Sequence, residues 1–457
     1  MGIFKKTKAK KSTETIRVVK PAQTGEADAK EPGQGQDNRQ EGKECIRSYM
    51  LAVPTDEADM REAEVLVDRL MQTKSFEITG IQQKSNELQL TVRFGGQIHQ
   101  VELYPASVQL PELYRVQHFF PDVDIEALQN SKVGLGIAME FGPDALTSYH
   151  LQLKLLHAAL PQKLAVFDDS SEKILSGTWV AMAADSVVPP APRYIYTVQA
   201  VSGDDDCVWL HTHGLSRCGL TELEILNSDK EMYQSHYSII ETMANRMLEL
   251  PEPLEEGEPL YMARLSENDH LVAALLSWEH AVELYDDDML GGKKDRRESH
   301  NENTSAIFIY PSEEDFENGK LSPVSIYNKL LADNPIYMLS TAETRRMKAL
   351  AAERVDYMKQ AAADSDNHVL LKLGLAVDEQ YRTEDNSQEH IWFELKEILE
   401  DGSLKAELTQ EPYYIEGLHA GYVGTYDCSQ ITDWLIYTPQ RRISPDDVYL
   451  LELEERE

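Results

Sequence analysis

The stretch from Cys207 to Leu226, CVWLHTHGLSRCGLTELEIL, concentrates side chains that can do chemistry. Its pattern predicts a strand, a glycine turn and a second strand. Side chains alternate along a strand with a period of two, so one face of the first strand carries Cys207, Trp209, His211 and His213. A polar group buried without a partner costs about 1–3 kcal/mol. These side chains must therefore be satisfied by one another, by the backbone, by water or by a ligand.

One interpretation of this stretch is a divalent metal site that serves a hydrolase or a metal-binding protein. His211 and His213 would chelate the ion, and Cys207, Cys218 or Glu222 would complete the ligand set. The spacing C-x3-H-x-H-x4-C matches no known zinc pattern. The simpler interpretation is a pair of histidines whose ring nitrogens bond the backbone while Trp209 packs beside them. No cofactor is therefore predicted, and the metal stays as the alternative.

A second interpretation is an anion site. We expect His211, His213 and Arg217 to border a pocket, because a strand end beside a glycine turn leaves backbone amides free for a ligand. A polar loop over 286–303 carries Gly291-Gly292 and is expected to be the lid. Its basic side chains are those of Lys293, Lys294, Arg296 and Arg297. Such a site would bind a small anion or an acidic peptide segment. The loop has neither GxxxxGK[ST] nor GxGxxG, so a charged surface loop is the simpler interpretation.

Composition restricts the classes of partner. The chain has 457 residues and a formal net charge of −35, which disfavours binding to nucleic acid or to anionic lipid. No apolar run approaches the roughly 20 residues that cross a bilayer, so no membrane insertion is expected. Four widely spread cysteines do not resemble a disulfide framework, and a cytoplasmic location is expected.

The length predicts two or three domains. Residues 1–43 form a basic and polar segment without apolar periodicity, and disorder is predicted for them. A small α+β layer is expected over 44–105 and a central α+β domain over 106–365. The remainder, 366–457, is expected to be a small antiparallel β module. The fold class is thus α+β, with mixed or antiparallel sheets and packed helices.

Local patterns give the elements of the central region. PDALTSYHLQLKLLHAAL, which begins at Pro143, predicts a helix with His150 and His157 at the edge of the core. These histidines lie two turns apart, about 10 Å, which is too far to share one ion. TWVAMAA, from Thr178, is predicted as a strand. Ser228 followed by Glu231 is typical of a capping box and predicts the start of a helix.

The C-terminal region has a different pattern. HVLLKLGLAV, HIWFELKEIL and SLKAELT predict three strands, and Asp401-Gly402 predicts a hairpin turn between the last two. Tyr413, Tyr414, Trp392 and Trp434 are expected to fill the core of this module or to line a groove.

Longer sequence segments resemble two known families. ELYRVQHFFPDVDIEAL, SYHLQLKLLHAALP, VWLHTHGLSRCGLTELEIL and NPIYMLS resemble an uncharacterised bacterial family, domain of unknown function 4026. HIWFELKEI, ELTQEPYYIEGLHAG and ITDWLIYTP resemble a small bacterial module, domain of unknown function 2314. The resemblance implies a bacterial, cytoplasmic setting and brings no catalytic residue with it.

Two classes of function stay open. The first is a non-catalytic binding or protein-interaction protein, favoured by the lack of a nucleophile elbow, nucleotide loop, zincin helix or cysteine knuckles in the sequence. The second is the metal-dependent alternative at His211 and His213. The sequence favours a protein that is not an enzyme.

Overall fold

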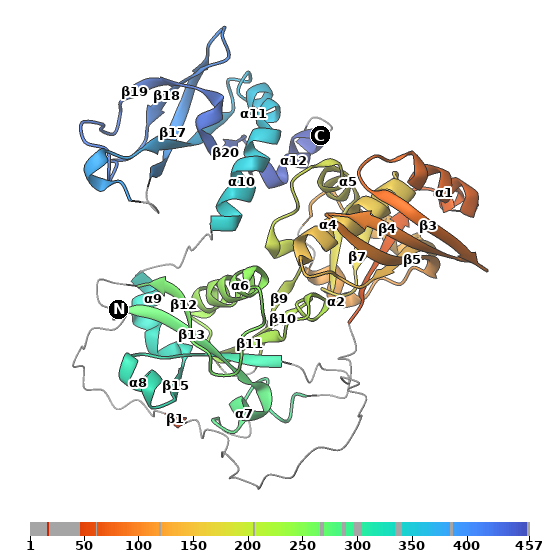
Figure 1. Ribbon diagram of the computed structural model, residues 1–457, viewed down its shortest axis with the longest axis horizontal. Coiled ribbons are helices and arrows are strands. Elements are labelled where there is room, and N and C mark those ends of the chain that lie inside the picture. The colour runs from red at the N-terminus through yellow and green to blue at the C-terminus, as the bar shows by residue number, and fades with distance from the viewer. Residues whose placement is uncertain are drawn as a thin grey trace, which may run out of the picture.

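The structure is a computed structural model with three β-sheets and packed helices, an α+β fold as the sequence predicts (Figure 1). It describes residues 16–17, 46–60, 62–117, 120–203, 206–265, 269–285, 289–296, 304–333, 341–383 and 387–454. The predicted disorder of residues 1–43 falls outside these ranges, except for a two-residue strand, β1 (Ile16–Arg17). No helix in the described ranges is long and apolar enough to span a membrane.

The first sheet has seven strands in the order β3-β4-β5-β6-β2-β7-β8, and every neighbouring pair is antiparallel. Its strands are β2 (Ser48–Pro54), β3 (Glu77–Lys84), β4 (Glu87–Phe94), β5 (Gln97–Ser107), β6 (Val133–Met139), β7 (Lys163–Asp168) and β8 (Lys173–Ser176). The sheet therefore continues well past residue 105, where the small N-terminal layer was expected to end. The reason is that β6 and β7 pair on both sides of β2, which buries β2 in the middle of the sheet.

Helices α1 (Ala63–Gln72), α2 (Glu112–Gln117), α3 (Ile125–Asn130), α4 (Ala145–Ala159) and α5 (Gly177–Asp185) accompany this sheet. Helix α4 is the predicted one, and Asp144 caps its N-terminus by accepting a hydrogen bond from the Thr147 amide. His150 is buried in the core, where its Nε2 lies 2.9 Å from the Ala183 carbonyl oxygen. That contact accounts for a histidine on an apolar helix face.

The segment TWVAMAA is helical, so its prediction as a strand was wrong. Ser176 caps α5 through its Oγ, which accepts a hydrogen bond from the Trp179 amide 3.0 Å away. Three alanines in the helix favour helical backbone, and Trp179 and Val180 turn into the core. The N-cap serine and tertiary packing outweigh the local preference of valine and tryptophan for strands.

The second sheet has eight strands. Its main path runs β1-β15-β14-β11-β10-β9, and β12 joins through β13, which pairs with β14. The bounds are β9 (Thr197–Ser202), β10 (Cys207–His213), β11 (Glu222–Asp229), β12 (Leu260–Arg264), β13 (His270–Ser277), β14 (Thr304–Ile309) and β15 (Lys320–Pro323). The β11–β14 pair is parallel, which makes this the mixed sheet of the molecule.

Helix α6 (Tyr233–Glu249) covers one face of the second sheet, and α7 (Trp278–Val282) lies against β13 and β14. The short helices α8 (Glu313–Glu317) and α9 (Asn328–Asp333) complete this part. Ser228 does not cap α6, contrary to the prediction, because it still belongs to β11. Its Oγ lies 2.8 Å from Nδ1 of His236, inside the helix.

The C-terminal part consists of α10 (Thr341–Glu353), α11 (Val355–Ala361), an antiparallel sheet and α12 (Tyr449–Glu454). The sheet order is β19-β18-β17-β16-β20-β21, with β16 (His368–Ala376), β17 (Gln388–Ile398), β18 (Leu404–Leu408), β19 (Val423–Tyr426), β20 (Ile431–Tyr437) and β21 (Arg442–Ile443). Trp434 fills its core and donates a hydrogen bond to the Ala351 carbonyl oxygen of α10. Tyr413, by contrast, is 80% exposed and takes no part in this core.

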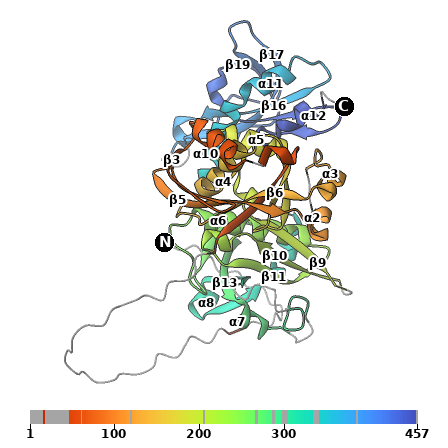
Figure 2. The same ribbon diagram turned by 90° about the vertical axis from the view of Figure 1, so that its right-hand side faces the viewer.

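The C-terminal part is attached to the rest through polar contacts and apolar packing. Asp446, in the short 3-10 helix η7 (Pro445–Asp447), lies 3.9 Å from the Arg193 guanidinium, and Arg346 of α10 donates to the Pro189 carbonyl oxygen at 3.4 Å. Tyr449 of α12 packs into the core of the first sheet, beside Phe120. Figure 2 shows the three parts stacked one above another, with the first sheet in the middle.

Replacement of Gly402 by Val tests the hairpin turn between β17 and β18. Gly402 has a φ of 83°, a left-handed conformation that a β-branched residue adopts at a cost. Nothing lies within 4 Å of an added Cβ, so the cost is one of backbone alone. We expect Gly402→Val to lower the free energy of unfolding by about 1 kcal/mol or more, measured by urea denaturation. Gly402→Asn is the control and should lose less, since asparagine tolerates this conformation. Equal midpoints for parent and Val variant would contradict the turn assignment.

Candidate functional site

Arg217, predicted to border a pocket, is buried between the two sheets. The guanidinium forms two bonds to the Asp168 carboxylate, at 2.7 and 2.8 Å, and neither side chain is exposed. It also donates to Ser48 Oγ at 3.0 Å and to the Ile195 carbonyl oxygen. Burial lowers the pKa of Arg217, but the Asp168 charge more than offsets this and leaves the pKa raised. Arg217 therefore joins β2 and β7 of the first sheet to the β10–β11 turn of the second.

His211 lies in a stack of side chains on the face of the second sheet opposite α6. Its ring stacks on that of Trp209, with 4.2 Å between the centroids. The Arg296 guanidinium lies over Trp209 and over Trp278, 5.3 and 4.4 Å from their ring centroids. Glu224 accepts hydrogen bonds from Arg296 at 2.5 Å and from Trp209 Nε1 at 3.2 Å. The described part of the basic loop, residues 289–296, thus packs against this face of β10.

His213 and its neighbours connect this face with the first sheet. Nδ1 of His213 lies 3.7 Å from Oε1 of Glu172, and Gln199 Nε2 donates to Glu172 Oε2 at 2.7 Å. Glu172 lies in the turn between β7 and β8 and has a φ of 53°, which is uncommon for a residue other than glycine. The strained turn therefore directs a carboxylate from one domain onto β9 and β10 of the other.

Two other predicted metal ligands, Glu222 and Cys218, are in environments that disfavour metal binding. Both carboxylate oxygens of Glu222 accept hydrogen bonds, from Thr212 Oγ1 and from the amides of Gly214 and Ser216. Burial raises the pKa of the Cys218 thiol to about 12, which disfavours the thiolate that a metal needs. In the ranges that the structure describes, no three His, Cys, Asp or Glu side chains form a group that could hold a metal ion.

Within the basic loop, the described residues have protein partners. The Gly291 amide donates to Asp295 Oδ2 at 2.8 Å, Lys293 bonds Glu283 at 2.7 Å, and Arg296 bonds Glu224. Lys294 is exposed, and Arg297 lies outside the described residues. The structure brings His211, His213 and Arg296 to one face of β10 but directs Arg217 into the domain interface. That these residues bind a ligand stays a prediction.

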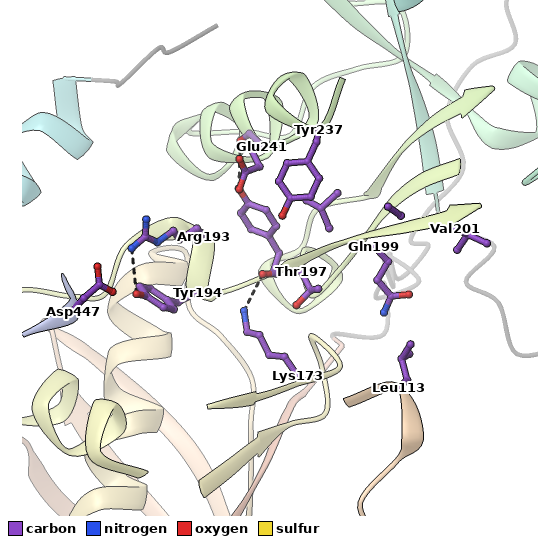
Figure 3. A pocket seen from close by; sticks show the side chains of 13 residues that line it. Leu113, Lys173, Arg193, Tyr194, Thr197, Gln199, Val201, Tyr237, Glu241 and Asp447 are labelled. Atoms are coloured by element: carbon purple, nitrogen blue, oxygen red, sulfur yellow. Dashed lines mark hydrogen bonds between the residues drawn. The ribbon is translucent and has the colours of Figure 1, made fainter. Parts of the chain in front are cut away.

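A cavity of about 760 Å³ lies where the two large sheet domains and the C-terminal part meet (Figure 3). We call it the junction groove. Five consecutive residues of β9 line it, together with side chains from α2, β8, α6, η7 and the 3-10 helix η2 (Pro192–Tyr194). The lining residues are Leu113, Lys173, Arg193, Tyr194, Tyr196, Thr197, Val198, Gln199, Ala200, Val201, Tyr237, Glu241 and Asp447.

Tyrosines form the fixed walls of the junction groove. Tyr196 Oη donates to Asn245 Oδ1 of α6 at 2.9 Å, which holds its ring against the helix. Tyr237 lines the groove from α6, and burial raises its pKa to about 12. At one end, the Arg193 guanidinium lies 5.1 Å from the centroid of the Tyr194 ring and donates to its hydroxyl at 3.3 Å. Burial raises the pKa of all three tyrosines, so their hydroxyls stay protonated at neutral pH. Each side chain combines an apolar ring with a polar tip.

Lys173 is the most unusual charged group of the groove. The residue is 2% exposed, and its ammonium donates to the Tyr196 carbonyl oxygen at 2.9 Å. Burial lowers its pKa to about 7; Asp168 opposes this change, and Arg217 and Arg193 add to it. Burial likewise raises the pKa of the Glu241 carboxyl above its ordinary value, and Arg193 opposes the rise. Burial in the groove thus disfavours the charged forms of both Lys173 and Glu241.

Sequence reasoning missed the junction groove. Its lining comes from segments between residues 113 and 447, so no local motif marks it. The signal that was present is the phrase RYIYTVQAV, whose tyrosines follow the proline-rich segment VVPPAP. In the structure the strand begins only at Thr197. The preceding residues form η2 and the link between the two sheets.

The fold and the groove define an α+β protein with two large sheet domains joined at a ligand-sized cavity. The chain belongs to the family described as protein of unknown function DUF4026. Its N-terminal model matches residues 48–190, and its C-terminal model matches residues 198–308. The two family domains therefore meet at residues 191–197, beside the junction groove. No curated protein and no solved structure is similar enough to count as a match. The family models end before the C-terminal module, whose resemblance to domain of unknown function 2314 stays a prediction.

Replacement of Asp168 by Asn tests the pair that joins the domains. Asn keeps the size of the side chain but leaves the buried Arg217 charge uncompensated, so we expect a loss of about 3–5 kcal/mol of unfolding free energy. Urea denaturation measures it. The control is Glu77→Gln at the exposed Glu77–Arg93 pair, which should change stability by at most about 1 kcal/mol. Similar losses in the two variants would contradict a special role for the buried pair.

Lys173 should make stability depend on pH. Its pKa is about 7 in the folded protein and 10.5 as the ordinary value, so between these the unfolded chain binds the extra proton. Stability therefore rises as pH rises from 7 to 10 and is lost as pH falls through that window. We expect Lys173→Met to flatten the slope of unfolding free energy against pH near pH 8.5 by up to about 1.4 kcal/mol per unit. Urea denaturation at several pH values measures this, with the exposed Lys84→Met as control. An unchanged slope in the Met variant would contradict the burial of the charge.

Proposed function

We propose that this protein is a non-catalytic binding protein that holds its ligand in the junction groove. The observation that carries the proposal is the position of the groove, at the meeting point of the two DUF4026 domains and η7 of the C-terminal part. Ligand sites form preferentially at domain interfaces, and a volume of about 760 Å³ is within the range of such sites. The resemblance to a bacterial family supports a bacterial, cytoplasmic setting.

The side chains that line the groove support the binding of a ligand through its shape and through hydrogen bonds. Tyr194 and Tyr196 are each 2% exposed, so contact with a ligand would fall to the partly exposed Tyr237 ring, a rigid surface that loses little conformational entropy when a ligand binds. The walls are held before any ligand arrives, by the bonds of Tyr196 to Asn245 and of Lys173 to the Tyr196 carbonyl. A groove held in this way binds without the cost of ordering its walls.

The charges of the lining favour a neutral ligand or one with charges of both signs. The lining includes two basic side chains, Lys173 and Arg193, and two acidic ones, Glu241 and Asp447. A ligand with a single strong charge would meet side chains of both signs. This differs from the small anion expected at the basic loop, and the two sites can be tested apart.

A thermal-shift screen of small fragments tests the proposal. Arg in place of the exposed Ala200 would fill the groove, and Arg in place of the exposed Ala376 puts the same charge on a strand outside it. A ligand at 100 times its Kd adds about 2.7 kcal/mol to the stability of the form it binds. We expect fragments that raise the Tm of the parent and of Ala376→Arg to lose their effect on Ala200→Arg. Hits that persist on Ala200→Arg would place the binding site elsewhere.

A further inference from the structure

We infer that the junction groove takes an extended, uncharged peptide segment that adds to the second sheet as a strand along the outer edge of β9. The inference rests on the proposed function and names the class of ligand. Recognition would come from main-chain hydrogen bonds to β9, with the groove walls selecting alternate side chains of the peptide.

The lining places the groove along an edge and not over a face. Residues 197, 198, 199, 200 and 201 all line it, without a gap. Side chains of successive strand residues point to opposite faces of a sheet, so a cavity over one face would touch only every second residue. Contact with five in a row means that the groove runs beside the strand, where the backbone itself is reached.

The outer edge of β9 offers main-chain groups. β9 pairs with β10 on one side, from Thr197 with His213 to Ser202 with Val208, and ends the path of the sheet. Within the described ranges no strand pairs with its other side. In an antiparallel pair every second residue turns its N–H and C=O away from the partner, so β9 presents such groups outward. The opposite end of the same path is covered by β1, which pairs with β15.

The groove has the length and the walls for a short strand. Five residues at about 3.3 Å each span roughly 17 Å. Figure 3 shows Tyr237 and Glu241 on one side of β9, and Lys173 and Leu113 on the other. An added strand would direct alternate side chains toward these two walls.

The walls favour apolar and aromatic side chains. The partly exposed Tyr237 lines the α6 side, and Leu113 and Val201, 41% and 37% exposed, give an apolar surface at the far end. Basic and acidic side chains both line the groove, so a run of like charges in the peptide has no matching field. The occupant that fits is therefore an uncharged segment of about five residues with apolar or aromatic side chains at alternate positions.

The experiment selects binders from a displayed library of random ten-residue peptides on the full-length protein. The tightest binder is then synthesised with a single N-methyl group at each position in turn, and Kd is measured by calorimetry. An N-methyl group removes a donor and blocks pairing, and only alternate amides of an added strand face β9. We expect Kd to weaken about tenfold or more at every second position of a five-residue core and to change little between them. Binding should also protect the outward amides of β9 from hydrogen exchange.

Controls separate this inference from the proposed function. Ala200→Arg should abolish peptide binding and Ala376→Arg should retain it, with circular dichroism confirming that both fold. A library that yields no binder, or binders that Ala200→Arg retains, overturns strand addition, and the fragment screen then decides on the groove by itself. Binders lost on Ala200→Arg that show no period of two along the N-methyl series overturn strand addition while the groove stands as a binding site.

Discussion

The buried pair of Arg217 and Asp168 is the interaction on which the arrangement of the domains depends. Each charge has lost its contact with water, and such a loss is offset only when geometry and additional hydrogen bonds satisfy both partners. Here the bonds are twofold, and Ser48 and the Ile195 carbonyl take further N–H groups of the guanidinium. Displacement of one domain would leave a buried charge without its partner. The pair therefore selects one relative position of the two sheets.

The same pair determines the shape of the junction groove. The link between the two family domains passes through Ile195 and Tyr196, and buried cations hold these two consecutive carbonyls. Arg217, from the second sheet, bonds the first, and Lys173, from the first sheet, bonds the second. β9 begins at the next residue, so its direction and its distance from β8 follow from these bonds. The polar groups that stabilise the junction thus also position the edge that we propose to be recognised.

Sequence patterns predicted the features that depend on neighbours in the chain. The periodicity of α4 and the turn at Gly402 were evident, because the residues that determine them lie within a few positions. The density of polar side chains between Cys207 and Leu226 was also a valid signal of a constrained region. Its cause was not evident, since Arg217 meets its partner 49 positions away. α5 was missed because its alanines and cap compete with residues that favour strands, and the core decides between them.

An open strand edge is a hazard as well as a means of recognition, since two copies of a chain can pair through it. The formal net charge of −35 opposes such pairing, because two copies would have to bring like charges close together. A short uncharged peptide does not meet this repulsion. The walls of the junction groove add a steric limit, since a partner strand must enter between α6 and β8. Net charge and groove shape together disfavour the wide edge of another sheet, which is why we propose a single extended segment as the occupant.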